Sequence, residues 1–168
     1  MNTMPKFVVI NELDSFDYHD AELKNITWQG NDLVWVADSI NATTENSQNN
    51  FSKHMCVENA EIVFEACVVE RIIFSGCKTY SNGRLIECVE EEVVSPDKYD
   101  EIFKEIYTGD ENWIDGMYSY EKNEAGGYSA CFGIFGYTIT LSFLKSIVSW
   151  DVFAGEAWYE HPQWKQQK

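Results

Sequence analysis

A strict alternation of apolar and polar side chains constrains the fold most. Apolar residues occupy every second position from 137 to 143, and Thr or Ser fills the positions between them (YTITLSF). Successive side chains of a β-strand point to opposite faces, so this period of two predicts a strand with one buried face. The same period recurs at residues 60–68 (AEIVFEACV) and blurs at 68 and 69, which predicts a bulge or turn near residues 67–70. The frequent β-branched residues there disfavour a helix.

Turn sequences between apolar stretches predict antiparallel hairpins. The strongest is residues 81–84 (SNGR), in which Asn82-Gly83 would supply the positive φ angles of a type I′ turn. The other two predicted hairpins join residues 23–28 to 33–37 and residues 117–121 to 128–135.

One helix is signalled, at residues 96–107. Ser95 suits the N-cap, Pro96 suits the first helical position, and Gly109 lies beyond the predicted end. Apolar residues at 99, 102, 103 and 106 recur at helical spacing and would pack on a sheet. The fold class is therefore predicted to be α+β and β-rich, with mainly antiparallel strands in a sandwich or a curled sheet. No long linker divides the sequence, so residues 1–168 are predicted to form a single β-rich domain.

Two segments are less regular. Residues 41–50 (NATTENSQNN) carry small polar side chains that bond to their own backbone, and we expect an exposed, mobile loop there. Residues 6–10 (KFVVI) fit either a short strand or a loosely attached arm.

The charge of the chain limits its partners. Twelve basic and 28 acidic side chains give a formal net charge of −16. This charge repels phosphate backbones and anionic lipid surfaces, so we predict that the chain binds neither nucleic acid nor membrane. It would attract a basic protein and accelerate their association. The plainer alternative is that the charge only keeps the chain in solution.

The five cysteines indicate a reducing compartment. They are odd in number, include no C-x-x-C pair and follow an N-terminus without an apolar signal segment, so free thiols in the cytoplasm are expected. They lack the paired spacing of a zinc site, and we predict no cofactor and no metal. His54 lies close to Cys56 in the sequence, but no G-x-S-x-G elbow is present and we predict no catalytic site.

Residues 14–23 (DSFDYHDAEL) contain the residue types of a metal or acid–base site. A carboxylate can orient an imidazole, and both can bind a divalent cation. On a strand, however, Asp17 and His19 would point to one face and Asp20 to the other. We favour a structural motif in which His19 and Asp20 hold backbone groups at the start of the first strand. A metal-binding protein or metal-dependent hydrolase centred on Asp17, His19 and Asp20 is the alternative.

Two short patches resemble a known group of proteins. Residues 16–23 (FDYHDAEL) match a Phe-x-x-His-Asp-Ala-x-Leu/Ile segment that leads into the first strand of small bacterial β-rich proteins. Residues 149–153 (SWDVF), with Ala157-Trp158, are similar to the closing strand of the same proteins. In these patches the chain resembles the YxiG-like and toxin-immunity-like families, and the resemblance implies a non-enzymatic binding role.

We therefore predict a non-enzymatic cytoplasmic protein-binding module, specifically an immunity-like inhibitor of a basic toxin such as a nuclease. Adjacent glutamates favour an edge strand or an exposed end. The partner-binding residues are predicted to include Glu90, Glu91, Glu92, Asp110 and Glu111. A structural subunit of a larger assembly is a further alternative, and the oligomeric state is left open.

Overall fold

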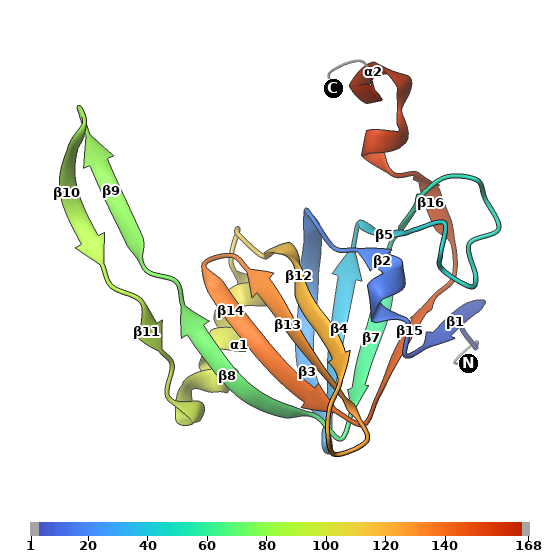
Figure 1. Ribbon diagram of the computed structural model, residues 1–168, viewed down its shortest axis with the longest axis horizontal. Helices are drawn as coiled ribbons and strands as arrows, with labels where there is room; N and C mark the ends of the chain where they lie inside the picture. The colour runs from blue at the N-terminus through green and yellow to red at the C-terminus, as the bar shows by residue number, and fades with distance from the viewer. Residues whose placement is uncertain (1–3, 166–168) are drawn as a thin grey trace.

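A ten-stranded antiparallel sheet forms most of the molecule (Figure 1). The computed structural model describes residues 4–165, with the side chains of residues 4–163. The strands lie in the order β1 (Phe7–Ile10), β15 (Lys145–Trp150), β7 (Ala60–Glu65), β4 (Asp32–Asp38), β3 (Ala21–Gln29), β12 (Trp113–Lys122), β13 (Tyr128–Ile134), β14 (Tyr137–Phe143), β8 (Val68–Phe74) and β11 (Glu92–Val93). The predicted β-rich α+β class with antiparallel strands is confirmed.

The large sheet is curled, so its two halves face each other across the core. Phe64 lies on β7 in one half, with its ring centroid 6.1 Å from Phe132 on β13 and 5.1 Å from Phe143 on β14. Trp35 of β4 lies 5.0 Å from Phe64, and all four rings are buried. Strands β1 and β11 are the two ends of the sheet. Of the two predicted arrangements, the structure therefore has the curled sheet.

The alternation in the sequence sets which face of a strand is buried. In β14 the side chains at 139, 141 and 143 are buried, whereas those at 138, 140 and 142 are half-buried. A turn at residues 66–67 divides β7 from β8, and the pairing of β8 with β14 skips Glu70, so the predicted irregularity near residues 67–70 is confirmed. Most of residues 6–10 form edge strand β1, in which Phe7 pairs with Trp150, and not a loose arm.

A second, four-stranded sheet packs beside β15. Its order is β16 (Phe153–Glu156), β6 (Met55–Val57), β5 (Ile40–Ala42) and β2 (Phe16–Asp17), and the 3-10 turn η1 (Leu13–Ser15) precedes β2. Phe16 meets Trp150 edge-on, with ring centroids 5.7 Å apart. Buried side chains of both sheets form one hydrophobic cluster.

The helix predicted at residues 96–107 is present. A 3-10 turn, η2 (Pro96–Lys98), leads directly into helix α1 (Tyr99–Thr108). Ser95 therefore stands before the 3-10 turn, and the α-helix proper begins at Tyr99. The chain continues to η3 (Trp158–Glu160) and α2 (Pro162–Lys165) at the end of the described segment. None of the helices within residues 4–165 is long and apolar enough to cross a membrane.

Helix α1 packs on the large sheet through its apolar side. Phe103 and Ile106 are buried, as the helical spacing predicts. The indole Nε1 of Trp28 on β3 donates a hydrogen bond to the Asp100 carboxylate, at 3.1 Å. This bond ties the first turn of α1 to β3.

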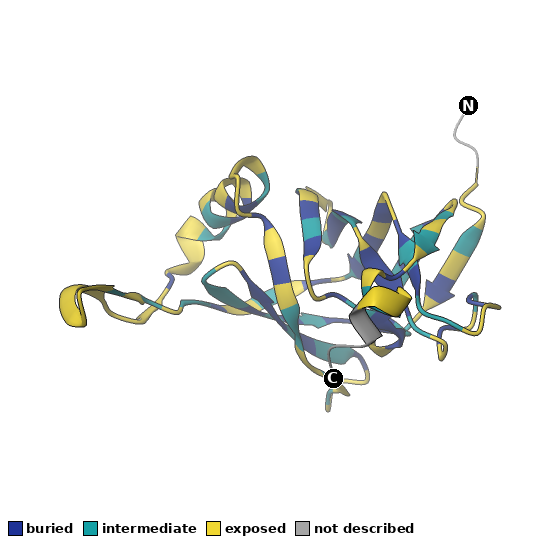
Figure 2. Ribbon diagram, turned by 90° about the horizontal axis from the view of Figure 1, so that it is seen from above, coloured by how far each residue is buried: buried dark blue, intermediate teal, exposed yellow. Residues whose placement is uncertain are grey.

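Strands β9 (Cys77–Ser81) and β10 (Arg84–Val89) form a separate hairpin that projects from the body (Figure 1). Asn82 (φ 49°) and Gly83 (φ 75°) both have positive φ, as the predicted type I′ turn requires. All residues from 77 to 91 are exposed except the half-buried Thr79 (Figure 2). We call residues 77–89, the two strands and their turn, the arm.

Residues 41–50 are not the exposed loop that the sequence predicts. Asn46 and Asn49 are buried, and the chain begins this segment in β5. The Asn49 amide donates hydrogen bonds of 3.1, 3.0 and 2.9 Å to the backbone carbonyls of Ala42, Thr43 and Lys53. An asparagine side chain is readily buried once its polar atoms are hydrogen-bonded. The partners come from both ends of the segment, which the composition of the segment does not reveal.

Candidate protein-binding surface

The arm carries exposed apolar side chains. Tyr80 and Leu85 are cross-strand partners and are 60% and 51% exposed. Ile86, at the bulge beside them, is 63% exposed, and Val89 is also exposed. Cross-strand partners share one face of a sheet, so Tyr80 and Leu85 form a single apolar patch. A two-stranded hairpin is only marginally stable alone in water, and exposed apolar patches mark interaction sites.

The two backbone segments at the base of the arm approach each other closely at Gly76. Gly76 has φ 74°, and a Cβ at this position would lie 2.4 Å from the carbonyl oxygen of Val89. A side chain there would force the two strands apart, so the position requires glycine. Beside it, the Ser75 N–H donates a hydrogen bond to the Gly136 carbonyl at 2.8 Å. The root of the arm therefore adjoins the turn between β13 and β14.

The three predicted glutamates lie at this root. Glu90 and Glu91 connect β10 to β11, and Glu92 pairs with Phe74 of β8 in the edge strand β11. All three glutamates are exposed. The edge position agrees with the prediction made from adjacent like charges.

Asp110 and Glu111, the other two predicted residues, line a groove of about 310 Å³ at the end of α1. The groove is completed by Glu105, Ile106, Gly109, Phe135 and Tyr137. The Tyr137 ring lies 5.5 Å from the ring of Phe74, which places the groove beside the root of the arm. The structure thus brings Asp110 and Glu111 together in one groove, whereas the three glutamates lie beyond Phe74 and do not line it.

Phe135 is a strained residue in this groove. With Gly136 it forms the two-residue turn between β13 and β14, at φ 25°. Such turns favour Asn, Asp or Gly, and a positive φ at another residue costs on the order of 1–3 kcal/mol. The Phe135 side chain is nevertheless 45% exposed, so burial in the core does not explain it. The Phe135 N–H donates a hydrogen bond to the backbone carbonyl of Trp113. Trp113 is also 45% exposed.

The groove combines aromatic walls with negative charge. Burial and then the nearby Glu105 carboxylate raise the pKa of Tyr137, so its hydroxyl stays protonated at neutral pH. Within the described part of the chain, no ion pair involves Glu105, Asp110 or Glu111. A cationic group entering the groove would meet three carboxylates that lack a counter-charge.

Several residues that line the groove could not be predicted from the sequence. Glu105 resembles any exposed acid on a helix, and Tyr137 occupies an ordinary core position of an alternating strand. Phe135 did offer a signal, because it precedes Gly136 in a short hairpin turn where Asn or Asp is usual.

Asp17, His19 and Asp20 lie where β2 passes into β3. The Asp17 carboxylate accepts the His19 backbone N–H at 3.0 Å, and His19 Nδ1 donates to the Asp115 carbonyl at 3.0 Å. The Asp20 carboxylate lies 3.6 Å from His19 Nε2. The Asp115 carbonyl, and then the Asp20 and Asp17 carboxylates, raise the pKa of His19. In residues 4–165 no group of three or more His, Cys, Asp or Glu side chains is placed to hold a metal ion.

His54 is directed at Tyr159 and not at Cys56. Its Nδ1 lies 2.8 Å from the Tyr159 hydroxyl. Burial raises the pKa of the Cys56 thiol, which keeps the sulfur protonated and poorly nucleophilic. All five cysteines are free, as predicted.

Comparison with known proteins identifies no significant match to this chain. No family model matches the chain, and no curated protein or solved structure matches it significantly. The fold and surface define a β-rich protein with an exposed arm beside an acidic groove. The resemblance of residues 16–23 to the YxiG-like and immunity-like families stays a prediction.

Proposed function

We propose that this chain is a non-enzymatic protein-binding module of the cytoplasm and that its arm is the main contact element. The observation that carries the proposal is the arm itself, which presents Tyr80, Leu85 and Ile86 to solvent, away from the core. The exposed apolar side chains of such an arm would be buried when a partner binds. Aromatic side chains such as Tyr80 are also enriched among the residues that dominate binding energies.

Charge selects the kind of partner. The net charge of −16 and the glutamates at the arm root favour a positively charged protein. Electrostatic attraction would accelerate the encounter and would weaken as salt is added. The same charge opposes close approach of a second copy, so it does not favour a self-assembling structural subunit.

The specific form of the proposal is an immunity-like inhibitor of a basic toxin such as a nuclease. Two independent features support it. Residues 16–23 and 149–153 resemble segments of immunity-like proteins, and the acidic surface suits neutralisation of a basic protein.

The proposal can be tested by calorimetric titration of the full chain against purified basic nuclease domains, including any encoded beside its gene. At about 20 mM salt we expect a Kd below about 1 μM for the true partner, with weaker binding at about 300 mM salt. Acidic domains of similar size serve as controls. If no basic domain binds even at low salt, the toxin-inhibitor proposal is wrong.

A matched variant tests the role of the arm. Replacing Tyr80 and Leu85 together by Ser keeps the charge and removes most of the apolar patch. We expect this change to weaken binding by about tenfold or more, as for a central contact of an interface. Unchanged binding would remove the arm from the interface.

A further inference from the structure

The groove at the end of α1 combines two aromatic side chains with three carboxylates. Phe135 and Tyr137 form one wall, and Glu105, Asp110 and Glu111 supply charge around it. Its volume of about 310 Å³ exceeds what a single long side chain needs, so a short stretch of backbone can enter with it. Among the residues that the structure describes, no basic side chain lines it.

The aromatic wall is positioned at a cost to the turn. Phe135 stands at φ 25°, where Asn or Gly would be relaxed, and its ring is left exposed beside the carboxylates. The exposed Phe135 ring therefore lines the same groove as the three carboxylates.

Carboxylates beside an exposed aromatic ring match a guanidinium group. Arginine stacks its planar guanidinium on aromatic faces and forms paired hydrogen bonds with carboxylates. A groove lined by one sign of charge also concentrates the opposite charge. Neutral or anionic side chains would leave the three carboxylates uncompensated.

We infer that this groove receives an arginine side chain from a basic protein segment, and that it acts together with the arm on one partner. The inference rests on the proposed function. Continuity supports the joint action, because the Ser75 N–H bonds to the Gly136 carbonyl and the Phe74 ring contacts Tyr137.

The first test uses a labelled peptide, acetyl-Gly-Arg-Gly-Arg-Gly, titrated against the full chain by fluorescence anisotropy. The control peptide contains citrulline in place of arginine, which keeps the shape and removes the charge. Asp110→Asn with Glu111→Gln should weaken arginine-peptide binding about tenfold or more, because charge-assisted hydrogen bonds are lost. Citrulline peptide should bind both proteins equally weakly.

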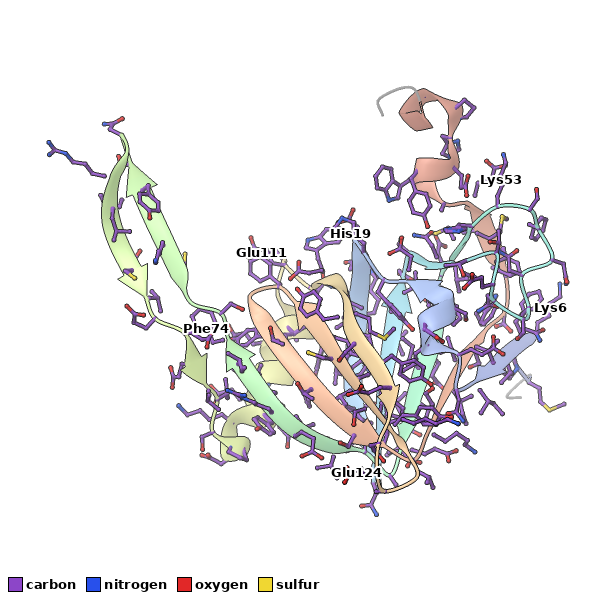
Figure 3. All side chains as sticks on the ribbon, viewed as in Figure 1. Lys6, His19, Lys53, Phe74, Glu111 and Glu124 are labelled. Atoms are coloured by element: carbon purple, nitrogen blue, oxygen red, sulfur yellow. The ribbon has the colours of Figure 1, made fainter. Side chains whose placement is uncertain are left out.

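A charge-matched variant distinguishes the effect of the groove carboxylates on peptide binding from the effect of net charge. Glu121→Gln with Glu124→Gln changes the net charge by the same amount at exposed positions, and Figure 3 shows Glu124 at the opposite end of the body from Glu111. This control should weaken peptide binding less than about twofold, as expected for screened, distant charges. If both double variants weaken binding equally, the groove is not the site.

Phe135→Asn tests the aromatic wall. Asparagine is favoured at a positive φ, so this variant should fold, and circular dichroism checks that it does. Loss of the ring should weaken arginine-peptide binding by about threefold or more through the lost cation–π contact. Unchanged binding would contradict a stacked guanidinium.

The same groove variants, titrated against a basic protein partner, distinguish the two proposals. If a partner binds the groove variants as tightly as the original chain, the groove inference falls and the proposed function stands. If the arginine peptide requires the groove but no basic protein binds, the groove stands and the proposed function falls.

Discussion

Asn49 shows at the residue scale how one side chain organises a polar segment. Its amide nitrogen bonds to three backbone carbonyls, and its Oδ1 accepts the Phe51 N–H at 2.9 Å. The side chain is almost completely buried. Its partners lie on both sides of residue 49, so one amide holds the two ends of the segment together.

Replacing Asn49 by Ala is expected to lower the free energy of unfolding by about 2–3 kcal/mol, because buried carbonyls lose their donor. Urea denaturation followed by circular dichroism measures this change. Asn50→Ala is the matched control, because Asn50 is exposed. This change should alter the free energy of unfolding by less than about 0.5 kcal/mol. Equal effects of the two changes would contradict the role given to Asn49.

Gly76 has a different residue-scale role, because it permits two backbones to approach. Gly76→Ala would place a methyl group against the Val89 carbonyl and is expected to loosen the root of the arm. The amides of residues 77–89 should then exchange faster with deuterium, and the melting temperature of the body should change by only about 2–4 °C. Hydrogen-exchange mass spectrometry measures the exchange rates of the arm and of the body in one experiment.

Gly83→Ala at the arm tip separates the two effects of removing a glycine. Gly83 also has a positive φ, 75°, but a Cβ there would have open space. Faster exchange in the Gly76 variant alone would identify the close contact as the cause. Equal acceleration in both variants would attribute the effect to backbone strain.

At the scale of elements, the arm is set apart from the rest of the sheet. Strands β9 and β10 pair only with each other among the sheets of the described chain, whereas β11 returns to the edge of the large sheet. The positions flanking the arm lie close together, since a Cβ at Gly76 would lie 2.9 Å from the backbone carbonyl carbon of Glu90. The arm is therefore a hairpin insertion whose two ends lie close together at the edge of the large sheet.

Deleting residues 77–89 and joining Gly76 to Glu90 through a short Gly-Ser link should leave the body folded. All the removed side chains except that of the half-buried Thr79 are exposed, so little buried apolar area is lost. The melting temperature should therefore change by less than about 4 °C. Differential scanning calorimetry measures this shift. A fall of more than about 10 °C would show that the body depends on the arm.

At the scale of the whole molecule, unbalanced negative charge is the dominant feature. The ion pairs of the described residues involve Lys24, Lys53 and Lys145, together with the pair between His19 and Asp20. Most acids therefore face solvent without a cation. Like charges on one compact body repel each other and reduce its stability.

Raising sodium chloride from about 10 mM to about 300 mM should raise the melting temperature by several degrees, because salt screens this repulsion. Differential scanning fluorimetry over a salt series measures the effect. A variant with Glu121→Lys and Glu124→Lys has a net charge closer to zero and should gain less from salt. A melting temperature that is flat or falls with salt would contradict dominant self-repulsion.

Features that depend on neighbouring residues can be predicted from the sequence alone. The alternation at residues 137–143 fixed a strand and its buried face, Asn82-Gly83 fixed a tight turn, and the pattern at 96–107 fixed the helix. Each follows from local backbone geometry and side-chain period, which act over a few residues.

The curl of the sheet, the burial of Asn49 and the composition of the groove depend on contacts between residues far apart in the sequence. The groove joins Glu105 and Asp110 at the end of α1 to Phe135 and Tyr137 on a distant hairpin. Their meeting depends on how α1 and the hairpin pack on the curled sheet, and no local pattern encodes that packing. The predicted acids were divided for the same reason, because Glu90 lies at the root of the arm, outside the groove that Asp110 lines.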